Sequence, residues 1–198
     1  YKKEGAKTYI SKAGTFFGEI VEKDRGENSA MLAVLRPSNV TKSPLEDKKY
    51  LQLGSVNDGN ASFFSKPGIY GWNKIDQGSK FLIENFIEFV QELDGVPKKI
   101  ADLGCGYGYL SVMASQLCGG EFIATDNNIA AVEVCNKTFN VHQVKGSSIL
   151  ADCGDAIEDK VDVLLCNPPF HKGFDVESDM SVKFLKAAKR ILKKEGVA

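Results

Sequence analysis

A regular alternation of apolar strands and amphipathic helices fills the second half of this 198-residue chain and constrains its fold more than any other feature. The predicted strands and helices, in chain order, are 98–104, 107–117, 121–126, 127–140, 147–153, 160–167 and 177–196, and a fifth strand is expected to start at 196. Strands that alternate with helices form parallel sheets covered on both faces. Because crossover connections are right-handed, the sequence predicts an α/β fold with a doubly wound, mostly parallel sheet.

The segments upstream of this pattern are less regular. Apolar spacing predicts a helix over 79–93, and 48–56 and 61–65 are typical of short strands. Nearer the N-terminus, a helix is expected around 16–21 and a strand over 31–35. Two prolines bracket a polar linker over 36–49, so we expect an N-terminal segment over 1–47 and a domain over 48–198. We also expect a fragment truncated at its C-terminus, because the chain begins with Tyr1 rather than Met and ends at Ala198 within an apolar pattern.

Composition excludes several classes of protein. With 43% hydrophobic and 26% charged residues, the chain is typical of soluble globular proteins, and we expect a cytoplasmic one because neither a signal peptide nor an apolar run of about 20 residues is evident. The five cysteines are far apart and form no Cys-x-x-Cys pair, so we expect neither a disulfide framework nor a metal site. The net charge of −1 gives no overall electrostatic preference for nucleic acid, and basic clusters are interpreted first as solvated faces.

A glycine-rich turn, ADLGCGYG, follows the first predicted core strand. Gly104, Gly106 and Gly108 allow a tight turn and close approach of a ligand, with Cys105 between the first two and Asp102 two residues before them. The spacing does not fit the dinucleotide pattern G-x-G-x-x-G. It resembles the D-x-G-x-G-x-G motif of class I S-adenosylmethionine-dependent methyltransferases, which implies a Rossmann-like fold and S-adenosyl-L-methionine as the cofactor.

Two further acids lie at the carboxyl ends of the next predicted strands, where doubly wound sheets bind ligands. The resemblance implies that Asp126, with Asn127 beside it, holds the cofactor ribose, that Asp152 and Cys153 lie at the adenine, and that Asp102 holds the methionine amino group. From the residues alone, Asp126 could instead cap the following helix, Asp152 could lie in an ordinary turn, and Asp102 could order the glycine loop.

The fourth predicted strand ends in Asn167, Pro168, Pro169 and Phe170. This N-P-P-F string resembles the catalytic motif of amino-methyltransferases that modify nitrogens conjugated to a π system. Such a nitrogen is a poor nucleophile, and acceptance of its N–H groups by the Asn167 side chain and the Pro168 carbonyl would aim its lone pair at a methyl donor. Phe170 offers a stacking face for a base. The alternative is that the prolines only end the strand and that Phe170 packs in the core.

Two longer strings narrow the resemblance. NPPFHKG and the upstream PGIYGWNKIDQGSKFLI are similar to motifs of bacterial ribosomal RNA guanine-N2 methyltransferases, especially the 16S enzyme. On this resemblance 48–198 is an incomplete catalytic domain, and 1–47 includes the end of a catalytically degenerate half. The family's Phe-Ser is replaced by Tyr70 and Gly71, which removes a serine near the cofactor. Asp76 and Ser79 could cover the methionine end of the cofactor, or either could cap the helix that follows.

The predicted function is therefore methylation of the exocyclic N2 amine of guanine in ribosomal RNA, with 16S RNA favoured. The expected partner is ribosomal RNA or the small ribosomal subunit, with neither a membrane nor a metal involved. A base in a duplex would have to be flipped out to react. The alternatives are methylation of a protein glutamine or of DNA adenine by the same geometry, and an inactive RNA-binding module with the same fold.

Overall fold

The computed structural model describes residues 6–25, 31–37, 50, 52–168 and 174–198. The chain forms two compact units, Tyr1–Lys48 and Lys49–Ala198. In the first unit, helix α1 (Ala6–Phe17) is followed by an antiparallel pair of strands, β1 (Gly18–Arg25) and β2 (Met31–Pro37). The prediction of a helix over 16–21 was wrong beyond Phe17, because Gly18 has a φ of 122° and the chain then pairs with β2.

The second unit contains a hairpin and a five-stranded sheet with its helices. Before the sheet come β3 (Gly54–Asn57), β4 (Ser62–Ser65), α2 (Gln77–Glu84) and α3 (Phe86–Val90). The sheet and its connections comprise β5 (Lys99–Leu103), α4 (Tyr109–Leu117), β6 (Glu121–Asp126), α5 (Ile129–His142), β7 (Gly146–Leu150), β8 (Val161–Cys166), α6 (Phe174–Ile191) and β9 (Leu192–Val197).

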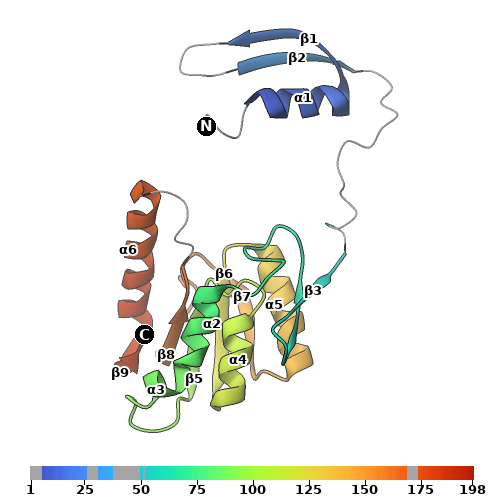
Figure 1. The fold of residues 1–198 in the computed structure, drawn as a ribbon. Helices are drawn as coiled ribbons and strands as arrows, with labels where there is room; N and C mark the ends of the chain where they lie inside the picture. The colour runs from blue at the N-terminus through green and yellow to red at the C-terminus, as the bar shows by residue number, and fades with distance from the viewer. Residues whose placement is uncertain (1–5, 26–30, 38–49, 51, 169–173) are drawn as a thin grey trace. The chain divides into compact units, whose positions relative to one another are not determined.

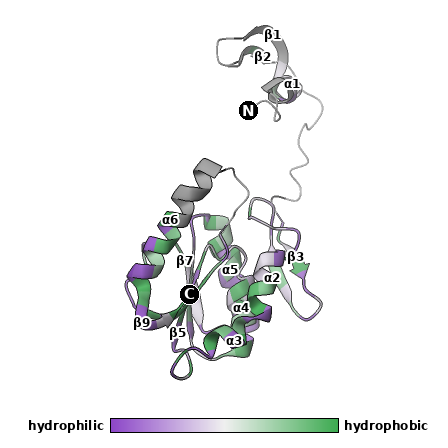
Figure 2. Cartoon of the chain, turned by 60° about the vertical axis from the view of Figure 1, so that its left-hand side comes forward, coloured by the Kyte–Doolittle hydropathy of each residue, from purple (hydrophilic) through white to green (hydrophobic). Residues whose placement is uncertain are grey.

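The sheet has the strand order β7-β6-β5-β8-β9, and every pair is parallel (Figure 1). Side chains of β5 alternate between two apolar cores. Ile100 belongs to the core that contains residues of α2, α4 and α5, and Leu103 belongs to the core that contains residues of α6. Figure 2 shows α4 largely in the hydrophobic colour, in keeping with the burial of its first four residues and Ala114. The structure therefore confirms the predicted doubly wound α/β fold.

The strand order reverses direction between β5 and β8, and this reversal positions the site. Successive connections run outward from β5 through β6 to β7, and then the chain returns to the other side of β5 as β8. Leu103 pairs with Cys166, so the residues that follow, Gly104 and Asn167, leave the sheet at the same edge. In open α/β sheets the crevice at such a switch point is where ligands bind.

Two predicted helices have different bounds in the structure. The segment 79–93 is interrupted at Asn85, whose side-chain amide donates to the Phe81 carbonyl and divides α2 from α3. The predicted helix 177–196 ends at Ile191, because the residues that follow pair with β8 as β9. Lys160 secures this junction by donating to the Arg190 and Leu192 carbonyls.

Candidate functional site

The glycine loop between β5 and α4 adopts the conformation that its spacing predicts. Gly104, Gly106 and Gly108 have φ values of 76°, 54° and 90°, a region that other residues rarely adopt. The Gly104 and Cys105 amides both donate to the Thr125 carbonyl at the end of β6, at 2.8 and 2.9 Å. The loop is therefore fixed to the neighbouring strand.

Gly108 has a second requirement, because a Cβ there would lie 2.9 Å from Cys135 Sγ and 3.4 Å from Phe139 Cε1. We expect Gly108→Ala to lower the free energy of unfolding by about 2–4 kcal/mol, measured by chemical denaturation. The matched control is Gly59→Ala, where φ is 99° and no atom lies within 4 Å of the added Cβ. Backbone strain alone should cost about 1–2 kcal/mol there. Equal losses in the two variants would contradict the close packing of Gly108 against α5.

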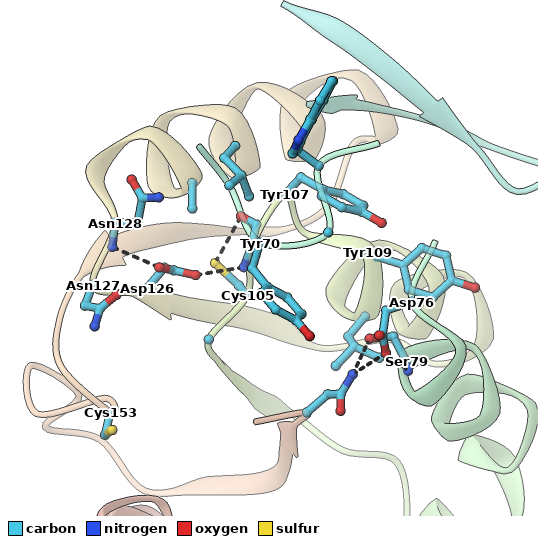
Figure 3. A pocket seen from close by; sticks show the side chains of 18 of the residues that line it. Tyr70, Asp76, Ser79, Cys105, Tyr107, Tyr109, Asp126, Asn127, Asn128 and Cys153 are labelled. Atoms are coloured by element: carbon cyan, nitrogen blue, oxygen red, sulfur yellow. Dashed lines mark hydrogen bonds between the residues drawn. The ribbon is translucent and has the colours of Figure 1, made fainter. Parts of the chain in front are cut away.

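Asp126, at the end of β6, joins the glycine loop to α5 (Figure 3). Its Oδ2 accepts from the Gly106 amide at 3.0 Å, and its Oδ1 accepts from the Asn128 amide at 2.9 Å. Asn128, rather than Asp126, caps α5, because its side chain accepts from the Ala130 amide. Each carboxylate oxygen of Asp126 keeps a further lone pair, as two vicinal ribose hydroxyls require.

Asp102 lies beneath the loop and is completely buried. Its Oδ2 accepts from Ser111 Oγ at 2.6 Å, but its Oδ1 has no partner among the residues that the structure describes. Burial raises the pKa of Asp102 to about 6, against the opposing effect of the Ser111 hydrogen bonds. A buried acceptor without a partner is costly unless a ligand completes it, and the ammonium group of S-adenosylmethionine would do so.

Asp152 and Cys153 lie in the turn two and three residues after β7 rather than within that strand. Asp152 Oδ2 lies 3.0 Å from Lys183 Nζ of α6, and the bonds from Lys183 and Cys153 lower the Asp152 pKa. Cys153, in the same turn, has a φ of 48°, a value that residues other than glycine rarely adopt. A polar turn beside an α6 side chain suits the edge of an adenine ring.

Asn167 follows the last residue of β8 and makes contact with the start of α2. Its Nδ2 donates to Asp76 Oδ2 at 2.7 Å and to Ser79 Oγ at 2.8 Å. Pro168 is half-buried beside it. The predicted residues Pro169 and Phe170 lie outside the described residues.

A pocket of about 810 Å³ lies at the switch-point edge of the sheet, a size within the ordinary range for nucleoside-like ligands. The predicted residues that line it are Gly104, Cys105, Gly106, Asp126, Asn127, Asp152, Cys153 and Asn167. Asp102, Gly108 and Pro168 are not among its lining residues. Asp102 and Gly108 instead support the loop from below. The other lining residues include Ile69, Tyr70, Trp72, Asp76, Ser79, Tyr107, Asn128, Ala151, Lys183 and Phe184.

Ser111, Lys183 and Phe184 had no role in the site predicted from the sequence. A buried serine, Ser111, within the apolar helix YLSVMASQL was the available signal for the partner of Asp102. Lys183 and Phe184 had no local signal, because only the packing of α6 against the sheet brings them to the pocket.

The thiols of the site are not activated nucleophiles. Burial raises the pKa of Cys166 and raises that of Cys153 to about 11, and the neighbouring Cys135 together with burial raises that of Cys105. Among the described residues, no group of three or more His, Cys, Asp or Glu side chains is arranged to hold a metal ion. Within the same residues, no helix has the length and apolar character needed to cross a membrane.

The fold defines an α/β protein of the Rossmann-like class, with a pocket at the switch point of its sheet. The methyltransferase small domain family model matches residues 60–198, and the chain belongs to that family. S-adenosyl-L-methionine is the cofactor that this family and this set of residues imply.

Several relatives of known name are similar to the chain. It is 34% identical over 135 residues to ribosomal RNA small subunit methyltransferase C of Buchnera aphidicola subsp. Schizaphis graminum, covering 67% of this chain and 38% of the relative. It is 33% identical over 189 residues to ribosomal RNA large subunit methyltransferase G of Aliivibrio salmonicida, covering 90% and 48%. The chain thus spans less than half the length of either relative.

Among solved structures, the chain is similar to a T. thermophilus 16S rRNA methyltransferase that modifies the N2 position of a G nucleotide, in complex with AdoMet and guanosine. The TM-score is 0.76 and the identity 24%, with 97% of this chain and 52% of that chain covered. This likeness confirms the fold.

Proposed function

We propose that this chain carries the active site of an S-adenosylmethionine-dependent methyltransferase that modifies the exocyclic N2 amine of a guanine in ribosomal RNA, with 16S RNA favoured. The observation that carries the proposal is the position of Asn167. It leaves the sheet at the switch point, directly beside the glycine loop, and lines the pocket that holds the cofactor residues. The names of both relatives, which are ribosomal RNA methyltransferases, support RNA as the substrate.

The residues of the pocket suit the parts of S-adenosylmethionine. Asp102, buried beneath the glycine loop, would bind the amino group directly or through water. Of the residues that line the pocket, Asp126 and Asn127 would bind the ribose hydroxyls, and Asp152 and Cys153 the adenine edge. The loop glycines Gly104, Gly106 and Gly108, with Cys105, would let the backbone lie against the cofactor. S-adenosylmethionine supplies an electrophilic methyl group on a sulfonium centre. The protein then has to orient an amine rather than activate a strong nucleophile.

Asn167 and Pro168 would orient that amine. An exocyclic amine delocalises its lone pair into the ring, and two acceptors on its N–H groups favour the pyramidal form whose lone pair can react. Asn167 Oδ1 supplies one acceptor, and the Pro168 carbonyl supplies the other. Proline holds this carbonyl in place because its φ is fixed and it has no N–H that could form a competing bond. The transferred methyl leaves an acidic ammonium, which loses its proton without a dedicated strong base.

The substrate base has to reach this amine-binding site from RNA. We propose that the base is flipped out of its stack, at a cost of a few kcal/mol, and that Pro169 and Phe170 complete its binding face. Stacking on an aromatic ring contributes about 1–3 kcal/mol. The unit Lys49–Ala198 carries the site, and the segment before it is proposed to be the end of a degenerate methyltransferase-like half.

The substrate class is tested by incubating the full-length protein with methyl-labelled S-adenosylmethionine and, separately, ribosomal RNA, DNA and a release-factor protein. We expect label in ribosomal RNA, and more in 16S than in 23S RNA. Label in DNA or in the protein, with none in RNA, would assign the same geometry to adenine or glutamine. Failure to bind the cofactor in calorimetry would instead indicate an inactive RNA-binding module.

A further inference from the structure

The side-chain amide of Asn167 is held by residues about 90 positions earlier in the chain. Nδ2 donates to Asp76 Oδ2 at 2.7 Å and to Ser79 Oγ at 2.8 Å. Asp76 is itself fixed, because it precedes α2 and its Oδ2 accepts from the Ser79 amide at 2.9 Å. The sequence left open whether Asp76 caps α2 or covers the cofactor. In the structure Asp76 caps α2 and also lines the pocket.

The chemistry of the carboxylate determines which way the amide faces. An ionised carboxylate only accepts hydrogen bonds, so the NH₂ end of Asn167 has to face Asp76. The reverse orientation would place Oδ1 against a negative oxygen at the same separation. Burial raises the pKa of Asp76, but hydrogen bonds from Ser79, Gly78 and Asn167 together hold it below the usual value, so the group is ionised at neutral pH.

The two bonds also use both N–H groups of the Asn167 amide. One goes to Asp76 and the other to Ser79, which leaves Oδ1 as the acceptor end. No described residue donates to that oxygen. An oxygen presented in this way is the group that an incoming amine N–H requires.

Gly78 closes the cluster through its lack of a side chain. A Cβ at this position would lie 3.1 Å from Asp76 Oδ2, 3.2 Å from Asn167 Oδ1 and 3.3 Å from Asn167 Nδ2. The backbone of the first turn of α2 therefore lies directly against the amide. The amide has little freedom to rotate away from its two acceptors.

We propose that Asp76 and Ser79 are positioning residues that lock the Asn167 amide with its oxygen turned towards the substrate amine. This inference rests on the proposed function, in which Asn167 binds that amine. The cluster joins the start of α2 to the end of β8, so it fixes the Asn167 side chain before substrate arrives. Preorganisation of this kind raises the rate of the chemical step rather than the affinity for the cofactor.

Variants can separate this role from helix capping. Asp76→Ser keeps a good cap but is too short to hold both the Ser79 amide and Asn167. Asp76→Asn keeps the cap and the reach but loses the charge that fixes the amide. Ser79→Ala removes one acceptor and leaves the capped backbone amide in place. Lys80→Ala is the matched control, because Lys80 lies next in α2 and pairs only loosely with Glu84 at 3.9 Å.

In single-turnover methylation, we expect rates to fall about 30-fold in Asp76→Ser, and about 5-fold in Asp76→Asn and Ser79→Ala. Lys80→Ala should be unchanged. Cofactor affinity from calorimetry should stay within about 3-fold throughout, and so the loss should be confined to the chemical step. In an Asn167→Ala background, Asp76→Ser should cause no further loss, because the group that it positions is absent.

Nuclear magnetic resonance tests the same contact without any reaction. The side-chain amide pair of Asn167, assigned by its loss in Asn167→Ala, should exchange slowly with solvent in the wild type and at least about 10-fold faster in Asp76→Ser. If Asp76→Ser weakens cofactor binding as much as it slows transfer, the cluster serves the cofactor and the inference is wrong. If Asn167→Ala transfers methyl at the wild-type rate, the proposed function itself fails, whatever the amide signals show.

Discussion

Asn167→Ala should slow methyl transfer about 100- to 1000-fold while S-adenosylmethionine still binds. The side chain follows the last residue of β8, and its hydrogen bonds to Asp76 and Ser79 are donated by Nδ2. Removal of a preorganised hydrogen-bonding group from a reacting centre lowers kcat by about 100- to 1000-fold. The cofactor contacts assigned to Asp102 and Asp126 come from other strands and are untouched.

The measurements are the single-turnover rate with labelled cofactor and the cofactor dissociation constant from calorimetry. Asn140→Ala is a suitable control, because Asn140 is an exposed asparagine of α5 outside the pocket. It should change neither quantity. Equal losses of cofactor affinity and rate in Asn167→Ala would refute the role of Asn167 in binding the amine.

Asp102→Asn should make the protein more stable but weaken its binding of the cofactor. The buried carboxylate has an unpartnered oxygen, and its pKa is raised from 3.8 to about 6 by burial. Above pH 6 this shift corresponds to roughly 3 kcal/mol of destabilisation of the ligand-free protein. The amide removes the charge, so we expect unfolding to require about 1–3 kcal/mol more at pH 8. Cofactor should bind about 100-fold more weakly, since the buried charge proposed to hold its amino group is lost.

The sign of the pH dependence gives an independent check. Because the folded-state pKa is raised, the folded protein binds the proton more tightly than the unfolded chain, and Asp102 destabilises the fold progressively as pH rises from about 4 to about 6. Asp102→Asn should lose this component of the stability profile, measured by denaturation across that range. Asp94→Asn, at an exposed carboxylate, is the control. An unchanged profile and unchanged cofactor affinity in Asp102→Asn would contradict the assignment.

The sequence was sufficient to predict the sheet, because its strands are short apolar runs separated by helices with clear periodicity. It also placed Asp102, Gly104, Asp126 and Asn167 at one edge, since the carboxyl ends of parallel strands share that edge. Helix ends were predicted less well. The pairing of Leu192–Val197 with β8 overrode the helical pattern there, and this pairing is a long-range contact that local periodicity does not encode.

The interactions within the site were less predictable than its location. Nothing in the string KIDQGS indicates that Asp76 and Ser79 would contact Asn167, because the contact depends on how α2 docks beside β8. The ion pair between Asp152 and Lys183 likewise depends on the packing of α6. Motif spacing therefore identified the site residues at the ends of the strands. Tertiary packing determined which side chains hold those residues in place.

The most direct measurement is nucleoside analysis, by mass spectrometry, of ribosomal RNA from cells that lack the gene, before and after treatment with the full-length protein and S-adenosylmethionine. We expect untreated 16S RNA to lack one N2-methylguanosine and treatment to restore it. Restoration of a different methylated nucleoside, or 16S RNA with its full set of N2-methylguanosines in the absence of the gene, would contradict the account.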